Sequence, residues 1–249
     1  MGRLTGKTAL VTGASRGIGA AIAVRLGQEG ARVIVNYAAS RERAEQVAAE
    51  IRSAGSQALL AQADVCDPLQ VNTMMLEIGN RTGGIDILIN NAGQGTDPGF
   101  LKLEDITPDN FDRVFNLNVR GLFFVTQGAV RLMPDNGRII MISSLAALGR
   151  MAGLAIYSAS KAAVDALARN ISIELAPRGI TVNSLNVGMI ETELTAQIDN
   201  SMRKALIRSI PMGRIGRVND VGEVVAFLSS EESRWITGES IAVSGGSRG

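Results

Sequence analysis

Tyr157 and Lys161, four residues apart, are the residues of this chain best suited to acid–base chemistry. Residues at positions i and i+4 lie on one face of a helix, so the spacing predicts an ammonium beside a phenol. A phenol ionises near pH ~10, and a nearby cation favours its charged form. Tyr157 could therefore act as a general acid or base, with Lys161 lowering its pKa. Alone, the pair could equally be a half-buried tyrosine near a solvated lysine.

A glycine-rich turn near the amino end indicates a phosphate-containing ligand. Gly13, Gly17 and Gly19 lie between a short apolar run, residues 8–11, and a helical pattern, residues 18–29. Glycine lets the backbone approach a ligand closely, and the free N–H groups of a helix start favour a pyrophosphate. Such a turn can be a tight turn and nothing more. With a strand before it and a helix after it, the pattern predicts nucleotide binding.

Strand-like and helix-like patterns alternate along the chain, which is typical of a parallel sheet with helices on both faces. The predicted fold class is therefore α/β: one doubly wound, Rossmann-like domain over residues 1–249, with about seven strands. The stretch 188–217 has no clear pattern, and we expect a substrate-binding lid there. The expected strands are residues 8–11, 32–36, 58–63, 86–90, 138–143, 180–185 and 240–243, and the expected helices are residues 18–29, 41–54, 68–82, 108–133, 158–176 and 218–228.

Several candidate residues fall where expected strands end. Gly13, Asn90, Ser144 and Gly188 all lie at such ends. Ligands of open parallel sheets bind outside the carboxyl ends of the strands, so these positions predict one shared cleft. Scattered glycines and serines could otherwise be ordinary loop residues.

Taken together, the motifs resemble the short-chain dehydrogenase/reductase family, and especially its 3-oxoacyl-[acyl-carrier-protein] reductase-like members. The resemblance covers essentially the whole chain. It implies NADPH-dependent reduction of a ketone, such as a 3-oxoacyl thioester, to a secondary alcohol by hydride transfer. The motifs that carry it are Thr12-Gly13-x3-Gly17-Ile18-Gly19, Asp64, Asn90-Asn91-Ala92-Gly93, Asn118, Ser144, Tyr157-x3-Lys161 and Asn183.

Four residues form the catalytic group that the resemblance implies: Asn118, Ser144, Tyr157 and Lys161. Ser144 would donate a hydrogen bond to the ketone oxygen, where negative charge develops, although a serine there could also cap the strand end. Tyr157 would protonate the alkoxide, and Lys161 would also hold the nicotinamide ribose. Asn118 would complete a proton relay through water to Lys161, whereas an asparagine inside a helix could also mark a local bend.

The end of the second expected strand sets the cofactor preference. An acidic residue there would bind the adenosine 2′-hydroxyl, but this strand ends in Asn36 and Tyr37 without a carboxylate. A guanidinium pairs well with a phosphate, so the arginines around this strand end favour NADP over NAD. The polar and basic residues concerned are Arg16, Ser40, Arg41 and Arg43.

The resemblance also implies the remaining cofactor contacts. Asp64 and Val65 would contact the adenine, while Ile190 and Thr192 would contact the carboxamide and phosphates. The family usually has Pro-Gly after the sixth strand, whereas this chain has Val187-Gly188, and losing the fixed φ of proline predicts a less rigid loop. The full set is Gly13, Ser15, Arg16, Gly17, Ile18, Gly19, Asn36, Tyr37, Ser40, Arg41, Asp64, Val65, Asn91, Ala92, Gly93, Tyr157, Lys161, Gly188, Ile190 and Thr192.

Composition excludes several classes of function. The chain has no histidine, so histidine-based triads and histidine-ligated metals are impossible, and no metal site is expected. A net charge of +1 gives no electrostatic reason to bind nucleic acid. No apolar run reaches the ~20 residues that span a membrane. The single Cys66 suits a reducing compartment, and no secretory signal precedes the first strand, so we expect a cytoplasmic protein.

Two other functions fit the same residues. One is an NAD(P)-dependent secondary-alcohol, sugar-alcohol or steroid dehydrogenase. The other is a cofactor-sensing module without catalysis, against which the intact Ser144, Tyr157 and Lys161 argue. The expected partner is a small-molecule carbonyl or alcohol, whether the protein is a ketone reductase or an alcohol dehydrogenase.

We also expect a homotetramer. The expected helices 108–133 and 158–176 carry more apolar surface than packing on one sheet face needs. The resemblance implies that these two helices form a four-helix contact across a two-fold axis.

Overall fold

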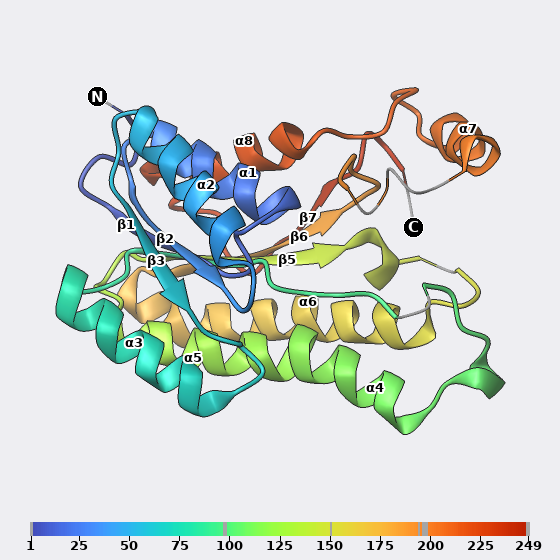
Figure 1. The fold of residues 1–249 in the computed structure, drawn as a ribbon, viewed down its shortest axis with the longest axis horizontal. Coiled ribbons are helices and arrows are strands. Elements are labelled where there is room, and N and C mark those ends of the chain that lie inside the picture. Colours follow the sequence, from blue (N-terminus) through green and yellow to red (C-terminus); the bar gives the residue numbers. More distant parts are fainter. Residues whose placement is uncertain (1, 97–98, 150, 194, 196–198, 248–249) are drawn as a thin grey trace.

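The computed structural model describes residues 2–96, 99–149, 151–193, 195 and 199–247. Its centre is a seven-stranded parallel sheet in the order β3-β2-β1-β4-β5-β6-β7 (Figure 1). The order reverses between β1 and β4, as in a doubly wound sheet. The predicted fold class is therefore confirmed. The strands are β1 (Thr8–Val11), β2 (Arg32–Tyr37), β3 (Ala58–Gln62), β4 (Ile87–Asn90), β5 (Arg138–Ser144), β6 (Thr181–Val187) and β7 (Ser240–Val243).

Helices cover both faces of the sheet (Figure 1). The layer of α1, α2 and α8 packs on one face, and α3 to α6 lie along the other. Side chains alternate between the two cores along each strand: Val33 and Val35 of β2 face the first layer, and Ile34 faces the second. The helices are α1 (Gly17–Gln28), α2 (Arg41–Ser53), α3 (Pro68–Thr82), α4 (Pro108–Phe115), α5 (Leu122–Leu132), α6 (Ala155–Leu175), α7 (Asn200–Ser209) and α8 (Val218–Leu228).

Local sequence explains where several of these helices begin. Asp67 accepts hydrogen bonds from the first backbone N–H groups of α3, and Pro68 follows it at the first helical position. Thr107 and Asn110 form a reciprocal capping box at the start of α4, again with a proline next. Such caps satisfy donors that a helix start leaves unpaired.

The expected helix 108–133 is interrupted. Between α4 and α5 the chain forms a π-helical turn, Asn116–Gly121. Gly121 allows a close approach here, because a Cβ on it would lie 2.8 Å from the carbonyl oxygen of Val65. The wider turn buries Asn118 beside α6, so the two asparagines of this segment mark a real change of helical geometry. π-Helical turns of this kind are frequent at functional sites.

Strand β6 extends further than expected, through Val187 rather than ending at residue 185. Asn186 and Val187 pair in register with Ser143 and Ser144 of β5. The expectation of a less rigid loop after this strand stays a prediction. Valine keeps the backbone N–H that proline lacks and is well suited to a strand, which explains the extension.

The stretch 188–217 contains α7, which the sequence analysis did not predict. Asp199 caps it by accepting hydrogen bonds from Ser201 and Met202. An isolated parallel bridge joins Ile190 to Gly216 and closes the base of the stretch. Residues 194 and 196–198 lie outside the described residues, and the lid assignment stays a prediction. No described helix is long and apolar enough to cross a membrane.

Candidate active site

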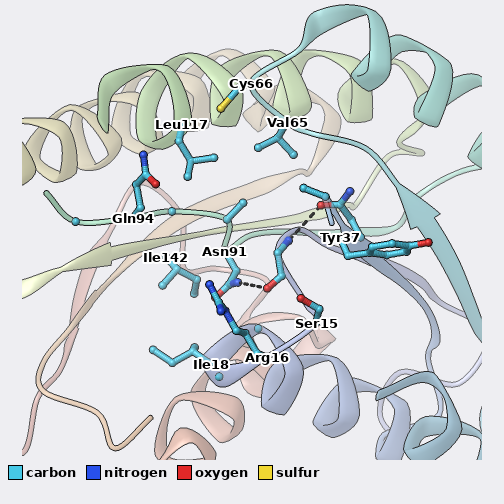
Figure 2. Close-up of a pocket in the computed structure, with 18 of the residues that line it drawn as sticks. Ser15, Arg16, Ile18, Tyr37, Val65, Cys66, Asn91, Gln94, Leu117 and Ile142 are labelled. Carbon is cyan, nitrogen blue, oxygen red and sulfur yellow. Dashed lines mark hydrogen bonds between the residues drawn. The ribbon is translucent and has the colours of Figure 1, made fainter. Parts of the chain in front are cut away.

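A cleft of about 970 Å³ opens at the carboxyl ends of the central strands. The glycine turn after β1, the ends of β2 to β6 and one side of α6 all contribute to it. Figure 2 shows part of this lining, with Arg16 of the glycine turn, Tyr37 of β2 and Asn91 after β4. Most of the predicted site residues therefore share one cavity. Those that line it are Gly13, Ser15, Arg16, Gly17, Ile18, Gly19, Asn36, Tyr37, Ser40, Asp64, Val65, Asn91, Ala92, Gly93, Ser144, Tyr157, Lys161, Gly188 and Thr192.

Three predicted site residues do not line this cleft. Arg41 is exposed at the first position of α2. Ile190 is 5% exposed and pairs with Gly216 at the base of the 188–217 stretch. Asn118 is 1% exposed and lies behind the cleft wall. The assigned roles of these residues stay predictions.

Hydrogen bonds fix the shape of the glycine turn (Figure 2). The amide of Asn91 donates to the carbonyl oxygens of Thr12 and Gly13 at 2.9 and 3.1 Å. Gly19 packs directly on this amide, since a Cβ there would lie 2.4 Å from Asn91 Nδ2. Gly13 itself has a φ of 61°, a conformation that favours glycine. The hydrogen bonds from Asn91 and the close packing of Gly19 thus fix the backbone of the turn where it lines the cleft.

Asn36 has a structural part in the same turn. Its Oδ1 accepts from Gly13 N at 3.2 Å, while its Nδ2 donates to the carbonyl oxygens of Ala61 and Ala63, each at 3.1 Å. With both ends of the amide engaged and 1% of the residue exposed, Asn36 shapes the cleft rather than offering a free group to it. Its neutrality leaves no negative charge at the end of β2.

The start of α1 is suited to an anionic ligand. The residue preceding the helix, Arg16, makes no side-chain capping hydrogen bond, so the first N–H groups receive no side-chain acceptor. The nearest atom to a Cβ built on Gly17 is Thr192 Cγ2, at 3.8 Å. Open space, free N–H groups and the helix dipole together fit the pyrophosphate of a dinucleotide.

Helix α6 and the end of β5 bring the acid–base residues together. Burial raises the pKa of the Tyr157 phenol, and the Ser144 side chain has a smaller, lowering effect. Lys161 Nζ donates to the carbonyl oxygen of Ile142 at 2.9 Å and lies 5.9 Å from the Tyr157 ring centroid. That the charge of Lys161 lowers the phenol pKa stays a prediction.

Lys161 is itself strongly perturbed. Burial lowers the pKa of its ammonium to about 8, and the charge of Asp165 acts in the opposite direction. A buried cation loses hydration, which favours the neutral amine. Lys161 therefore changes charge within the range of pH at which the protein can be assayed.

Asn118 makes hydrogen bonds next to the acid–base residues. Its Nδ2 donates to the carbonyl oxygen of Gln94 at 2.9 Å and to Ser160 Oγ at 3.0 Å, while its Oδ1 accepts from Gln94 N at 2.9 Å. A Cβ on Gly93 would lie 3.2 Å from both Asn118 Oδ1 and Lys161 Nζ. The side-chain amide thus ties the segment after β4 to α6, and the water relay stays a prediction.

Several lining residues were not predicted. Gln94 directly follows the Asn-Asn-Ala-Gly motif, so extending that motif by one residue would have found it. Arg113 and Leu117 come from α4 and the π-helical turn, whose position beside the cleft no local pattern reveals. Cys66 also lines the cleft, and burial, with a further contribution from Asp64, raises the pKa of its thiol to about 11. Among the described residues no group of three or more acidic, histidine or cysteine side chains could hold a metal.

Comparisons with known proteins agree with this geometry. The sequence model of the family described as enoyl-(acyl carrier protein) reductase matches residues 13–248. A versicolorin reductase of Emericella nidulans is 44% identical, with 98% of this chain and 96% of the relative covered. A 3-oxoacyl-[acyl-carrier-protein] reductase of Staphylococcus aureus is 39% identical, covering 96% and 97% respectively.

Solved structures agree as well. A short-chain dehydrogenase/reductase from Serratia marcescens superposes with a TM-score of 0.94 at 38% identity, covering 98% of both chains. An angucycline C-6 ketoreductase with bound NADP superposes with a TM-score of 0.92 at 40% identity, covering 98% of this chain and 96% of the other.

Proposed function

The chain belongs to the short-chain dehydrogenase/reductase family of oxidoreductases, which act on carbonyl and alcohol groups, and we propose that it reduces a ketone to a secondary alcohol with NADPH. One observation carries the proposal. Ser144, Tyr157 and Lys161 line one cleft together with the glycine turn, and the Ser144 side chain lowers the pKa of the Tyr157 phenol. The cleft therefore contains a proton donor, Tyr157, and a hydrogen-bond donor, Ser144, and both can bind the oxygen of a carbonyl substrate.

Each of these residues has a distinct chemical task in ketone reduction. Ser144 donates a hydrogen bond to the ketone oxygen and stabilises its developing negative charge. Burial raises the pKa of the Tyr157 phenol, so it keeps its proton at ordinary pH and delivers it to the same oxygen. The carbonyl carbon would receive its hydride from NADPH when that cofactor is bound. Lys161, charged below about pH 8, favours the negative charge that the phenol acquires as it gives up its proton.

We propose NADP rather than NAD as the cofactor. The end of β2 has no carboxylate to meet an adenosine ribose, and Asn36 is neutral and engaged. Arg16 and Ser40 line the same end of the cleft and can meet a 2′-phosphate. The NADP bound to the related angucycline ketoreductase supports the same choice.

The substrate that we propose is a bulky apolar ketone. The stretches 145–154 and 188–217 carry large exposed apolar side chains, including Leu148, Met151 and Met212. Residue 150 of the stretch 145–154, which we expect to shape the substrate pocket, lies outside the described residues. Related proteins named for a versicolorin and an angucycline support a polycyclic aromatic substrate over an acyl thioester.

The decisive experiment is a substrate panel with both cofactors. NADPH or NADH oxidation is followed with α-tetralone, ethyl acetoacetate and acetoacetyl thioester as acceptors. We expect the highest kcat/KM for the bicyclic ketone with NADPH. Equal rates with NADH would refute the cofactor assignment, and a preference for the thioester would refute the substrate class. No turnover of any ketone would refute the proposed reaction.

We further propose that the protein is a cytoplasmic homotetramer. Phe111 and Phe123 on α4 and α5 are 45% and 39% exposed, and Ala159 and Ala162 of α6 are exposed on the same side of the sheet. Small residues allow helices from two copies to approach closely, and exposed aromatic rings favour burial. The single cysteine supports a reducing compartment.

A further inference from the structure

A buried polar pair lies behind the acid–base residues. Asp165 of α6 is 2% exposed and Asn186 of β6 is fully buried. The amide Nδ2 of Asn186 donates to Asp165 Oδ2 at 2.7 Å. A carboxyl is costly to bury, and a pair of polar side chains inside a core is normally retained for a reason other than stability.

The pair is joined to the residues that carry the chemistry. Asn186 Nδ2 also lies 3.4 Å from Ser143 Oγ and 3.3 Å from the carbonyl oxygen of Ser144. Ser143 Oγ in turn donates to the carbonyl oxygen of Lys161 at 3.2 Å. One side chain of β6 thus connects Asp165 to the end of β5, where Ser144 stands, and to the helix turn that carries Lys161.

Asp165 and Lys161 are two buried groups of opposite charge on one helix. They are four residues apart, which places their Cβ atoms about 5–6 Å from each other on adjacent turns. Among the described residues neither makes an ion pair within 4.0 Å, and Asp165 is the one charged group that acts appreciably on the pKa of the Lys161 ammonium. The attraction between buried charges is screened much less than at the surface.

The other charged side chains on the neighbouring elements are exposed, contact other residues or line the cleft. On α6 the next charged residue is Arg169, which is exposed and reaches Ser240. β6 has no ionisable side chain, and the only one of β5, Arg138, lies at its far end and contacts Ser230 and Glu231. In the π-helical turn Arg120 contacts the Cys66 carbonyl. Arg16 and Arg113 line the cleft in front of Lys161.

Two acceptor atoms of the pair remain without a donor among the described residues, Asp165 Oδ1 and Asn186 Oδ1. The hydrogen bond that Asp165 accepts comes from a neutral amide, so no cation pairs with this carboxyl within 4.0 Å among the described residues. The charge of Asp165 raises the pKa of the Lys161 ammonium.

We propose that Asp165, oriented by Asn186, is a positioning residue that keeps Lys161 protonated inside the cleft. It touches neither substrate nor cofactor, and it acts through the ammonium of Lys161. A protonated Lys161 is needed for the task assigned to it above, so the role in turnover rests on the proposed function. The charge coupling itself is independent of turnover and is measured without substrate.

The test is a lysine titration by nuclear magnetic resonance. The sequence has four lysines, so protein carrying ¹³C-labelled lysine gives few signals, and Lys161→Arg identifies the one of interest. In the wild-type protein we expect Lys161 to titrate at about pH 8. In Asp165→Asn, which keeps the shape and removes the charge, the midpoint should fall by roughly one pH unit. Glu174→Gln, an exposed change on the same helix, is the matched control and should leave the midpoint unchanged.

Turnover gives an independent measurement. If the midpoint falls by about one unit, the kcat/KM of Asp165→Asn should approach that of wild type at pH 6 and be roughly fivefold lower at pH 8. A merely structural role would lower activity equally at both values of pH, and that outcome would overturn the proposal. So would a Lys161 midpoint that does not move more in Asp165→Asn than in Glu174→Gln.

The wild-type titration keeps the proposal testable even if Asp165→Asn does not fold. A Lys161 signal that is already that of a neutral amine at pH 6 would show that Asp165 does not hold the proton there, and would overturn the proposal. Failure of the wild-type enzyme to reduce any ketone, with the lysine shift present, would instead refute the proposed function alone.

Discussion

The ammonium of Lys161 lies 5.9 Å from the centre of the Tyr157 ring, while its hydrogen bond goes to the carbonyl oxygen of Ile142. Burial raises the pKa of the phenol, and the Ser144 side chain lowers it by less. We therefore expect Lys161 to act on the phenol through its charge and Ser144 to act through its hydroxyl. The tasks of the three residues can be separated by substitution, because each substitution removes a different interaction.

Tyr157→Phe should abolish ketone reduction and leave NADPH binding nearly unchanged. The substitution removes only the hydroxyl that gives the proton, and the ring keeps its packing. We expect kcat/KM below a few per cent of wild type, with the NADPH Kd from fluorescence titration within about twofold. Trp235→Phe, a change at a 96% exposed aromatic residue that does not line the cleft, is the control and should retain activity. Substantial turnover by Tyr157→Phe would remove this residue from the acid–base role.

Ketone reduction should decline as the pH rises through about 8. Lys161 has a pKa lowered to about 8, so its charged form predominates below that pH and is lost above it. Tyr157, whose pKa is raised, keeps its proton across this range. The kcat/KM at saturating NADPH, measured from pH 6 to 9.5, should therefore have a plateau on the acid side. A rate that rises steadily with pH would contradict the assignment of the charged lysine.

Arg16→Ala should weaken NADPH binding much more than NADH binding. Hydrogen bonds to a charged group contribute about 1.5–3 kcal/mol, so a loss of roughly ten- to a hundredfold in NADPH Kd is expected. Because Arg41 does not line the cleft, adding Arg41→Ala should have the smaller further effect. Arg52→Ala, at an exposed position of α2, is the control. Equal losses for both cofactors would show that Arg16 does not bind the 2′-phosphate.

Much of the fold and of the site was predictable because it depends on local signals. Alternating apolar runs and helical periods fix the order of strands and helices, and a parallel sheet then brings its strand ends together. The role of Asn36 was not predictable, because its partners on β3 become neighbours only through strand pairing. The π-helical turn and the place of Arg113 beside the cleft were not predictable for a related reason. Sequence periodicity does not distinguish the wider turn from an ordinary helix, and that turn decides what lies beside the cleft.

Gly19→Ala should destabilise the glycine turn and impair cofactor binding. The new Cβ would lie 2.4 Å from Asn91 Nδ2 and 2.6 Å from the Gly13 carbonyl oxygen, so the turn must shift. Gly222→Ala in α8 is the matched control, because its Cβ would meet Arg25 at an ordinary 3.4 Å. Alanine favours a helix over glycine by about 1 kcal/mol, so the control should keep or raise Tm. Equal Tm and NADPH affinity in both variants would contradict the close contact.

The remaining prediction concerns assembly. Phe111 stacks on Phe115 with ring centroids 4.4 Å apart, yet Phe111 stays 45% exposed, and Phe123 on α5 is also partly exposed. Apolar rings that pack on each other without being covered favour a second copy of the chain. Light scattering at micromolar concentration should give about four times the chain mass of 26.2 kDa.

A charged side chain placed in the contact should separate the copies. Ala162→Arg puts a long cationic side chain on the exposed face of α6 that carries small residues, and a contact between copies would bury its charge without a partner. Ala54→Arg, at an exposed position after α2 on the other side of the sheet, makes the same change away from this face. The first should lower the mass and, because α6 carries Tyr157 and Lys161, the activity as well, while the second should change neither. A wild-type protein that scatters as a fully active monomer would exclude the tetramer.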